Sequence, residues 1–215
     1  KALNIALMDT LKPIIASVID VLCFDGNGYS EEWKKEAQRR GLDTETSVPE
    51  MIKVFTLPES VAMFERTGVY SEKELYARNE VRWDMYSKKV QIESRVMARM
   101  AINHIIPAAI EYKTRLLKEI SLNKEVFGGI DGCSTEIDAV RQIASLVEEI
   151  KMKVDEMFEM RKTANGLDDE YMKASKYKEV ADMLLELRIP IDALEEIVDN
   201  NLWPLPKYRE LLFIS

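Results

Sequence analysis

The fold is decided by residues 71–122, SEKELYARNEVRWDMYSKKVQIESRVMARMAINHIIPAAIEYKTRLLKEISL, a run without glycine and with one proline, Pro107. Ser71 and Glu74 have the spacing of a capping box, in which the serine caps the first turn and the glutamate reaches back. Apolar residues recur at helical spacing on one face: Leu75, Trp83, Tyr86, Val90, Met97, Met100, Ala101, Ile105, Ala108, Tyr112, Leu116 and Ile120. The sequence therefore predicts a helix of roughly 75 Å, which needs other elements along its whole apolar face.

Two more long helices are predicted downstream, over residues 134–164 and 168–200. Their apolar positions recur in steps of three and four, as in a packed helical seam. Lys151 falls within the first seam, where it either fixes the register or extends its ammonium group to solvent. Pro190 interrupts the second seam and is expected to kink that helix. Three apolar stripes of matched length predict an antiparallel three-helix bundle.

The residues before the long run predict shorter helices. Residues 3–22 carry a wide apolar stripe, with Pro13 expected either to bend that helix or to break it. Residues 24–70 then hold three start signals: Ser30, a capping box at Ser47–Glu50, and another at Thr56–Glu59. Because no segment alternates as a strand does, the predicted class is all-α: short helices, then a long-helix antiparallel three-helix bundle, with no sheet of its own.

Composition limits the function classes. The chain has 215 residues, 47% hydrophobic and 32% charged, with a net charge of −8 and its basic residues interspersed with acidic ones. Nucleic-acid binding is not expected, because phosphate binding needs a concentrated positive surface. The two cysteines are far apart in the sequence, so no disulfide framework is predicted. The sequence contains no run of eighteen apolar residues, so no membrane span is predicted. A cytoplasmic protein is expected, and its start at Lys1, inside a helical pattern, suggests a piece of a longer chain.

The residues that could carry chemistry are few. His104 is the single histidine and could act as an acid or base, but a hydrogen-bonded structural histidine is the favoured interpretation. The turn Asp25-Gly26-Asn27-Gly28 lacks the later ligands of a calcium loop. No phosphate-binding loop or nucleophile motif is found. The sequence therefore predicts no catalytic, cofactor-binding or metal-binding residue.

Several long motifs nevertheless resemble a known family. They are Ala77-Arg78-Asn79-Glu80, the run from Lys88 to Val96 (KKVQIESRV), the run from Asn103 to Ile110 (NHIIPAAI), and the ending from Leu202 to Phe213 (LWPLPKYRELLF). Together they resemble the C-terminal region of type III glutamine synthetases, and the resemblance extends over nearly the whole chain. It implies that this chain is about the last third of a larger enzyme.

The resemblance implies a parent enzyme that ligates ammonia to glutamate with ATP and Mg²⁺, in nitrogen assimilation. None of the family's catalytic motifs can be matched here, so this segment alone is predicted to be inactive. Its partners would be the rest of its own catalytic domain and other copies, in hexameric rings stacked as a dodecamer. The alternative is a free-standing helical interaction module with no catalytic parent.

The predicted organisation has three parts: residues 1–70 as the C-terminal helices of the catalytic domain, 71–200 as the bundle, and 201–215 as an extended docking tail. The tail concentrates apolar residues around Trp203, and Pro204 and Pro206 prevent it from being helical there. An exposed patch of this kind is costly, so we expect the tail to be buried against another part of the enzyme, with Trp203 as its anchor.

Overall fold

The computed structural model describes residues 2–24 and 26–212, leaving aside the side chains of residues 2, 20–22, 208 and 209. Every regular element in these ranges is helical and none is a strand, which confirms the all-α prediction. The chain divides into two compact units, residues 1–46 and 47–215, which are described separately.

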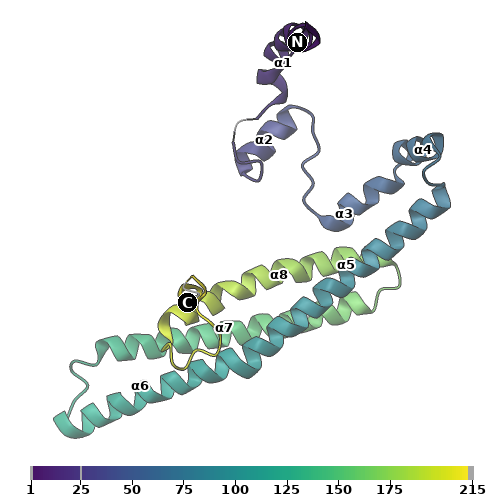
Figure 1. The fold of residues 1–215 in the computed structure, drawn as a ribbon. Helices are drawn as coiled ribbons and strands as arrows, with labels where there is room; N and C mark the ends of the chain where they lie inside the picture. Colours follow the sequence, from purple (N-terminus) through teal and green to yellow (C-terminus); the bar gives the residue numbers. More distant parts are fainter. Residues whose placement is uncertain (1, 25, 213–215) are drawn as a thin grey trace. The chain divides into compact units, whose positions relative to one another are not determined.

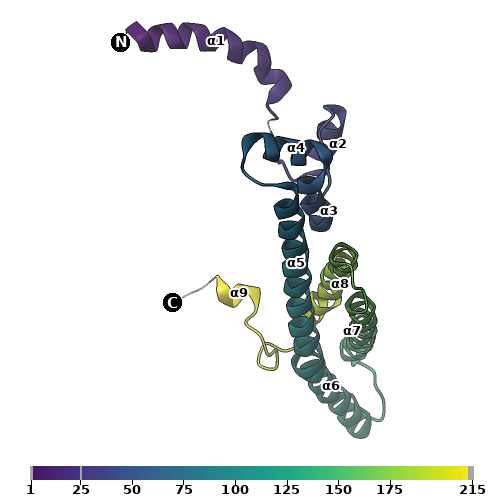
Figure 2. The ribbon, with the colours of Figure 1, turned by 90° about the vertical axis from the view of Figure 1, so that its right-hand side faces the viewer.

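The first unit contains α1 (Ala2–Leu22) and α2 (Glu31–Arg39). Ser30 caps α2 as predicted, because its hydroxyl oxygen accepts a hydrogen bond from the Trp33 backbone N–H at 3.1 Å. The Phe24 ring packs on Trp33, with the ring centroids 4.7 Å apart. Pro13 lies inside α1, which continues past it as one helix (Figure 2).

The second unit begins with three short helical segments, α3 (Val48–Lys53), η1 (Val54–Thr56) and α4 (Pro58–Thr67). The predicted capping box at Thr56–Glu59 is wrong. Leu57 is the N-cap residue of α4, and the Thr56 hydroxyl instead donates to the Lys53 carbonyl at 2.9 Å. The reason is Pro58, whose fixed φ makes it the first residue of the helix and places the cap one position later.

The long helix begins as predicted at the Ser71 cap. The Glu74 carboxylate accepts hydrogen bonds from the Ser71 backbone N–H and hydroxyl, both at 2.8 Å. The helix then comprises α5 (Glu72–Met100), the π-helical segment η2 (Ala101–Ile105) and α6 (Ile106–Phe127). On its solvent side, Lys88 pairs with Asp84 at 2.6 Å and Arg115 pairs with Glu111 at 2.8 Å.

The π-helical segment is the difference from the predicted uniform helix. The Ile106 backbone N–H donates to the Ala101 carbonyl, five residues earlier. Pro107 follows directly. It has no N–H that could hydrogen-bond to the carbonyl of residue 103, and in a regular α-helix its ring would clash with that carbonyl. A locally wider turn accommodates the proline without ending the helix.

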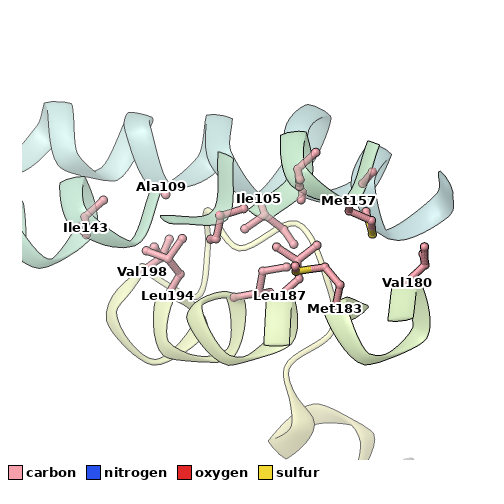
Figure 3. Close-up of a cluster of buried hydrophobic side chains, with 14 of the residues drawn as sticks. Ile105, Ala109, Ile143, Met157, Val180, Met183, Leu187, Leu194 and Val198 are labelled. Carbon is pink, nitrogen blue, oxygen red and sulfur yellow. The ribbon is translucent and has the colours of Figure 1, made fainter. Parts of the chain in front are cut away.

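Helices α7 (Ser134–Asn165) and α8 (Glu170–Ile197) complete the three-helix bundle. As Figure 1 shows, α7 runs back along the long helix and α8 returns in the direction of α5. Side chains from all three point into one core (Figure 3), and its largest fully buried side chains are Ile105, Ile143, Ile150, Val154, Met157, Tyr177, Val180, Leu187 and Leu194. The predicted bundle is therefore confirmed.

Lys151 takes the second of its two predicted roles, and Pro190 does not end its helix. Lys151 is exposed and pairs with Asp155 at 2.6 Å, because Ile150 and Val154 fill the seam and turn Lys151 outward. Pro190 is buried in the interior of α8, and the helix continues past it to Ile197.

The tail folds back onto the bundle of its own chain. Trp203 is 7% exposed and belongs to the bundle core, and Leu202 and Leu205 pack against that core. The Lys207 ammonium group donates to the Val198 carbonyl at 3.1 Å and also to the Glu195 carbonyl, which ties the tail to the end of α8. Leu211 and Leu212 are exposed, and Phe213 lies outside the described residues.

The expected domain boundary at residue 70 concerns the whole enzyme and stays a prediction. Within this chain, residues 47–70 group with the bundle rather than with residues 1–46. The physical reason is that α3 packs against both α5 and α8.

Candidate functional site

The described part of the chain offers no cluster of metal ligands. No three His, Cys, Asp or Glu side chains within residues 2–24 and 26–212 lie where they could share an ion. No described helix is both long and apolar enough to cross a membrane. The candidate functional features are therefore surfaces and one buried polar cluster.

His104 lies in the π-helical segment and is exposed. Its side chain makes no hydrogen bond with the residues that the structure describes, so its interpretation as a hydrogen-bonded structural histidine is wrong. The π turn rotates His104 away from the buried face that holds Ala101 and Ile105.

A polar junction fixes the short helices to the bundle. The Trp83 indole N–H donates to the Pro49 carbonyl at 3.0 Å, and the Asn79 amide donates to the Ile52 carbonyl at 2.8 Å. Tyr171 of α8 donates its hydroxyl hydrogen to Glu50, and its ring lies 5.3 Å from that of Trp83. One side of α5 therefore holds α3 through directed hydrogen bonds as well as through apolar contact.

Among the exposed large apolar side chains of the described residues, two groups follow one helix each. The first is α1, whose exposed apolar residues are Leu3, Ile5, Leu7, Met8, Leu11, Ile14, Ile15 and Ile19. The second is the outer face of α5, formed by Val81, Met85, Ile92 and Val96, which are 51–65% exposed. At 100° per residue these four lie within one narrow stripe, opposite the buried face of α5. Apolar stripes of this kind mark contact surfaces.

The polar cluster lies where α5, the end of α7 and α8 meet. The Gln91 amide donates to both the Tyr177 hydroxyl and the Asn165 side-chain oxygen, each at 3.0 Å. Tyr177, which is 1% exposed, donates in turn to Asn165 at 2.7 Å. Three uncharged side chains therefore satisfy one another and link the three helices.

Arg161 of α7 adjoins this cluster and is only 6% exposed. Its guanidinium group lies 5.7 Å from the centre of the Phe158 ring. Burial lowers the pKa of Arg161, and the positive charge of nearby Arg95 on α5 lowers it further.

Sequence reasoning missed Arg161 as a buried residue, although a signal was present. The buried positions of α7 run Ile150, Val154, Met157, Arg161 and Ala164, in steps of four, three, four and three. If the seam is extended beyond Phe158 with the same spacing, Arg161 falls at a core position. Full burial of an unpaired arginine is unusual in proteins.

Comparison with known proteins identifies the family. The family model described as the glutamine synthetase C-terminal domain matches residues 6–124. The chain therefore belongs to the glutamine synthetase C-terminal domain family. The resemblance to the C-terminal region of type III glutamine synthetases is confirmed.

Three similar proteins carry that name. A glutamine synthetase of Bacteroides fragilis is 44% identical over 93% of this chain and 28% of its own length. One of Butyrivibrio fibrisolvens is 32% identical over 88% of this chain and 27% of its own length. A type-3 glutamine synthetase of Dictyostelium discoideum is 25% identical over 99% of this chain and 29% of its own length. The chain thus spans less than a third of these relatives.

Proposed function

We propose that this chain is the C-terminal helical part of a glutamine synthetase, a cytoplasmic enzyme that ligates ammonia to glutamate with ATP in nitrogen assimilation. The observation that carries the proposal is the match to the glutamine synthetase C-terminal domain over residues 6–124. Further support covers most of the chain, because the relatives named glutamine synthetase match 88–99% of it.

The chemistry is assigned to the rest of the enzyme. Activating glutamate by phosphoryl transfer needs divalent metal ions held by carboxylates and cationic groups that steady the phosphates. The resemblance places none of the family's catalytic motifs on this sequence, and the described residues offer no metal-ligand cluster. ATP and Mg²⁺ would therefore bind outside this segment, and the segment alone would be inactive.

The role assigned to this segment is contact. The apolar residues of α1 would pack against the catalytic body of the same chain, since within residues 1–46 they remain exposed. The outer face of α5 would contact another subunit in a homo-oligomer of hexameric rings, stacked as a dodecamer. Burying such faces removes apolar area from water, which is the usual driving force of subunit association.

Two experiments test this proposal. The purified 215-residue chain should make no glutamine from glutamate, ammonia and ATP, whereas the intact enzyme should. If the purified chain makes glutamine, and glutamine synthetase of the expression host is shown to be absent, the assignment of catalysis to the rest of the protein is contradicted.

In the intact enzyme, Ile92→Glu on the outer face of α5 should shift the assembly to smaller species in analytical ultracentrifugation. Leu185→Glu is the matched control, because Leu185 of α8 is also exposed, at 69% compared with 63% for Ile92, and lies outside this face. If the Ile92→Glu variant assembles as the wild type does, the outer face of α5 is not a subunit contact.

A further inference from the structure

The outer face of α5 carries positive charge beside its apolar stripe. At 100° per residue, five cations lie within about 70° of the centre of that stripe: Arg78, Arg82, Lys89, Arg95 and Arg99. The carboxylates between residues 78 and 99 lie further round the helix, at about 90° or more. Asp84 pairs with Lys88, and none of the five cations forms an ion pair with the described residues. The face is therefore apolar along its centre and positive at its edges.

This charge is unusual for the chain. Helix α5 has seven basic and five acidic residues, whereas the whole chain has 30 basic and 38 acidic ones. Covering unpaired cations with a neutral surface costs free energy, because their hydration is lost without replacement. A partner that buries the apolar stripe should therefore bring carboxylates to its edges.

The shape of the stripe indicates that this partner is a helix. Its exposed residues Met85, Lys89, Ile92, Val96 and Arg99 follow one another in steps of four, three, four and three. That spacing is typical of a helix face that packs along a second helix. The required partner is thus a helix with an exposed face that is both acidic and partly apolar.

The outer face of α7 has these properties. Glu148, Met152 and Glu156 are four residues apart, so they form one exposed row on the side opposite the buried Ile150 and Val154. Met152 is 60% exposed. The carboxylates of α7 that form ion pairs with described residues are others, so Glu148 and Glu156 remain unpaired there. Beside the row lies an open pocket of about 510 Å³, lined by Ala144, Val147, Glu148, Lys151, Met152 and Asp155.

The two faces belong to helices that share one core, and each is exposed on the side away from that core. They therefore cannot cover each other within one chain. We propose that the outer face of α5 binds the outer face of α7 of a second copy of this chain. The carboxylates of Glu148 and Glu156 face the cations of α5, and apolar side chains of the α5 stripe enter the pocket beside Met152.

This inference rests on the proposed subunit contact of α5 and identifies the surface that it meets. A contact between two copies of the α5 face would bring cations against cations, which costs free energy. A contact between two different faces leaves one of each free on every pair, so further copies add until a ring closes. The α5–α7 contact is therefore of the kind that builds the hexameric ring proposed above.

The test is a charge exchange between the two faces of the intact enzyme. Lys89→Glu/Arg99→Glu reverses two exposed cations of α5, and Glu148→Lys/Glu156→Lys reverses two exposed carboxylates of α7. Assembly is followed by analytical ultracentrifugation at low ionic strength, because salt screens exposed charges. Circular dichroism should match the wild type in every variant, since all four side chains lie at the surface.

Either pair alone should shift the assembly to smaller species. Like charges then face each other across the contact, which should raise its dissociation constant at least about tenfold. The variant that carries both pairs should assemble as the wild type does, since opposite charges again face each other.

The matched control replaces the α5 pair by Lys118→Glu/Lys124→Glu on α6. Both lysines are exposed and form no ion pair with the described residues. Combined with the α7 pair, this control has the same net charge as the exchanged variant, but it should stay dissociated. Restored assembly of the control would show that net charge rather than the α5–α7 contact decides the outcome.

Two results overturn the proposal: an exchanged variant that stays dissociated, or wild-type assembly of either pair alone. The Ile92→Glu variant keeps these results distinct from the contact role of α5. If Ile92→Glu dissociates while the exchange restores nothing, the outer face of α5 is a subunit contact whose partner is a surface other than α7.

Discussion

The indole N–H of Trp83 lies 3.0 Å from the carbonyl oxygen of Pro49, a residue 34 positions earlier in the chain. Pro49 is itself buried within α3, and this partly buried hydrogen bond joins the short helix to the long one. Tyr171 packs on the same indole and bonds Glu50. The junction of α3, α5 and α8 is thereby held in one orientation, since hydrogen bonds are directional and apolar contacts are not.

Asn79→Ala should destabilise the second unit by about 1–3 kcal/mol, because Asn79 is fully buried and its amide satisfies the Ile52 carbonyl at 2.8 Å. Denaturant unfolding followed by circular dichroism provides the measurement. Asn103→Ala, at an exposed position on the same long helix, is the control and should leave the midpoint unchanged. Equal midpoints for the two variants would mean that the α3 junction adds no stability.

Trp203→Ala should lower the free energy of unfolding by about 3–5 kcal/mol, because it leaves a large cavity at the end of the bundle. Trp203→Phe should lower the free energy of unfolding much less. It keeps an aromatic ring there and removes a buried indole N–H that has no hydrogen-bond partner among the described residues. Thermal melts and sizing of both variants, beside Leu212→Ala at an exposed position, test the docking of the tail.

His104→Ala should change the free energy of unfolding by less than about 0.5 kcal/mol, because the side chain is exposed and free of hydrogen bonds to the described residues. Urea titration of the variant and the wild type measures the difference. A loss well above this value would instead support the structural role that the sequence favoured.

Glu36 should titrate far below an ordinary glutamate. Hydrogen bonds from Arg39 and Arg40 lower the pKa of its carboxyl group from 4.5 to about 2. Because the folded pKa lies below the unfolded one, the stability gained is fully present above pH 4.5 and is lost as pH falls toward 2. Carboxyl chemical shifts measured by NMR across this range give the pKa directly. Arg39→Gln should move it back toward 4.5, and an unmoved value would exclude Arg39 as a cause.

The sequence by itself determined the helical class and most helix boundaries. Caps such as Ser30 and the Ser71–Glu74 pair are local, since a side chain bonds a backbone group three residues away. The apolar stripes are also local patterns, and they predicted the three long helices and many of the buried positions of their shared core, such as Val90, Ile143 and Leu187. The high density of apolar residues around Trp203 predicted that the end of the chain is a docking segment.

Only the tertiary structure decides which other element packs on each helix face. Spacing shows that Trp83 and Asn79 face inward, but not that carbonyls of α3 lie opposite them. The turn at Ala101–Ile105 depends on how the helix accommodates Pro107, and that turn carries His104 to the surface. Gln91 and Tyr177 are 86 residues apart, and no pattern within either helix predicts the hydrogen bond between their side chains. Packing brings them together, because which helices become neighbours is decided by burial of the whole core.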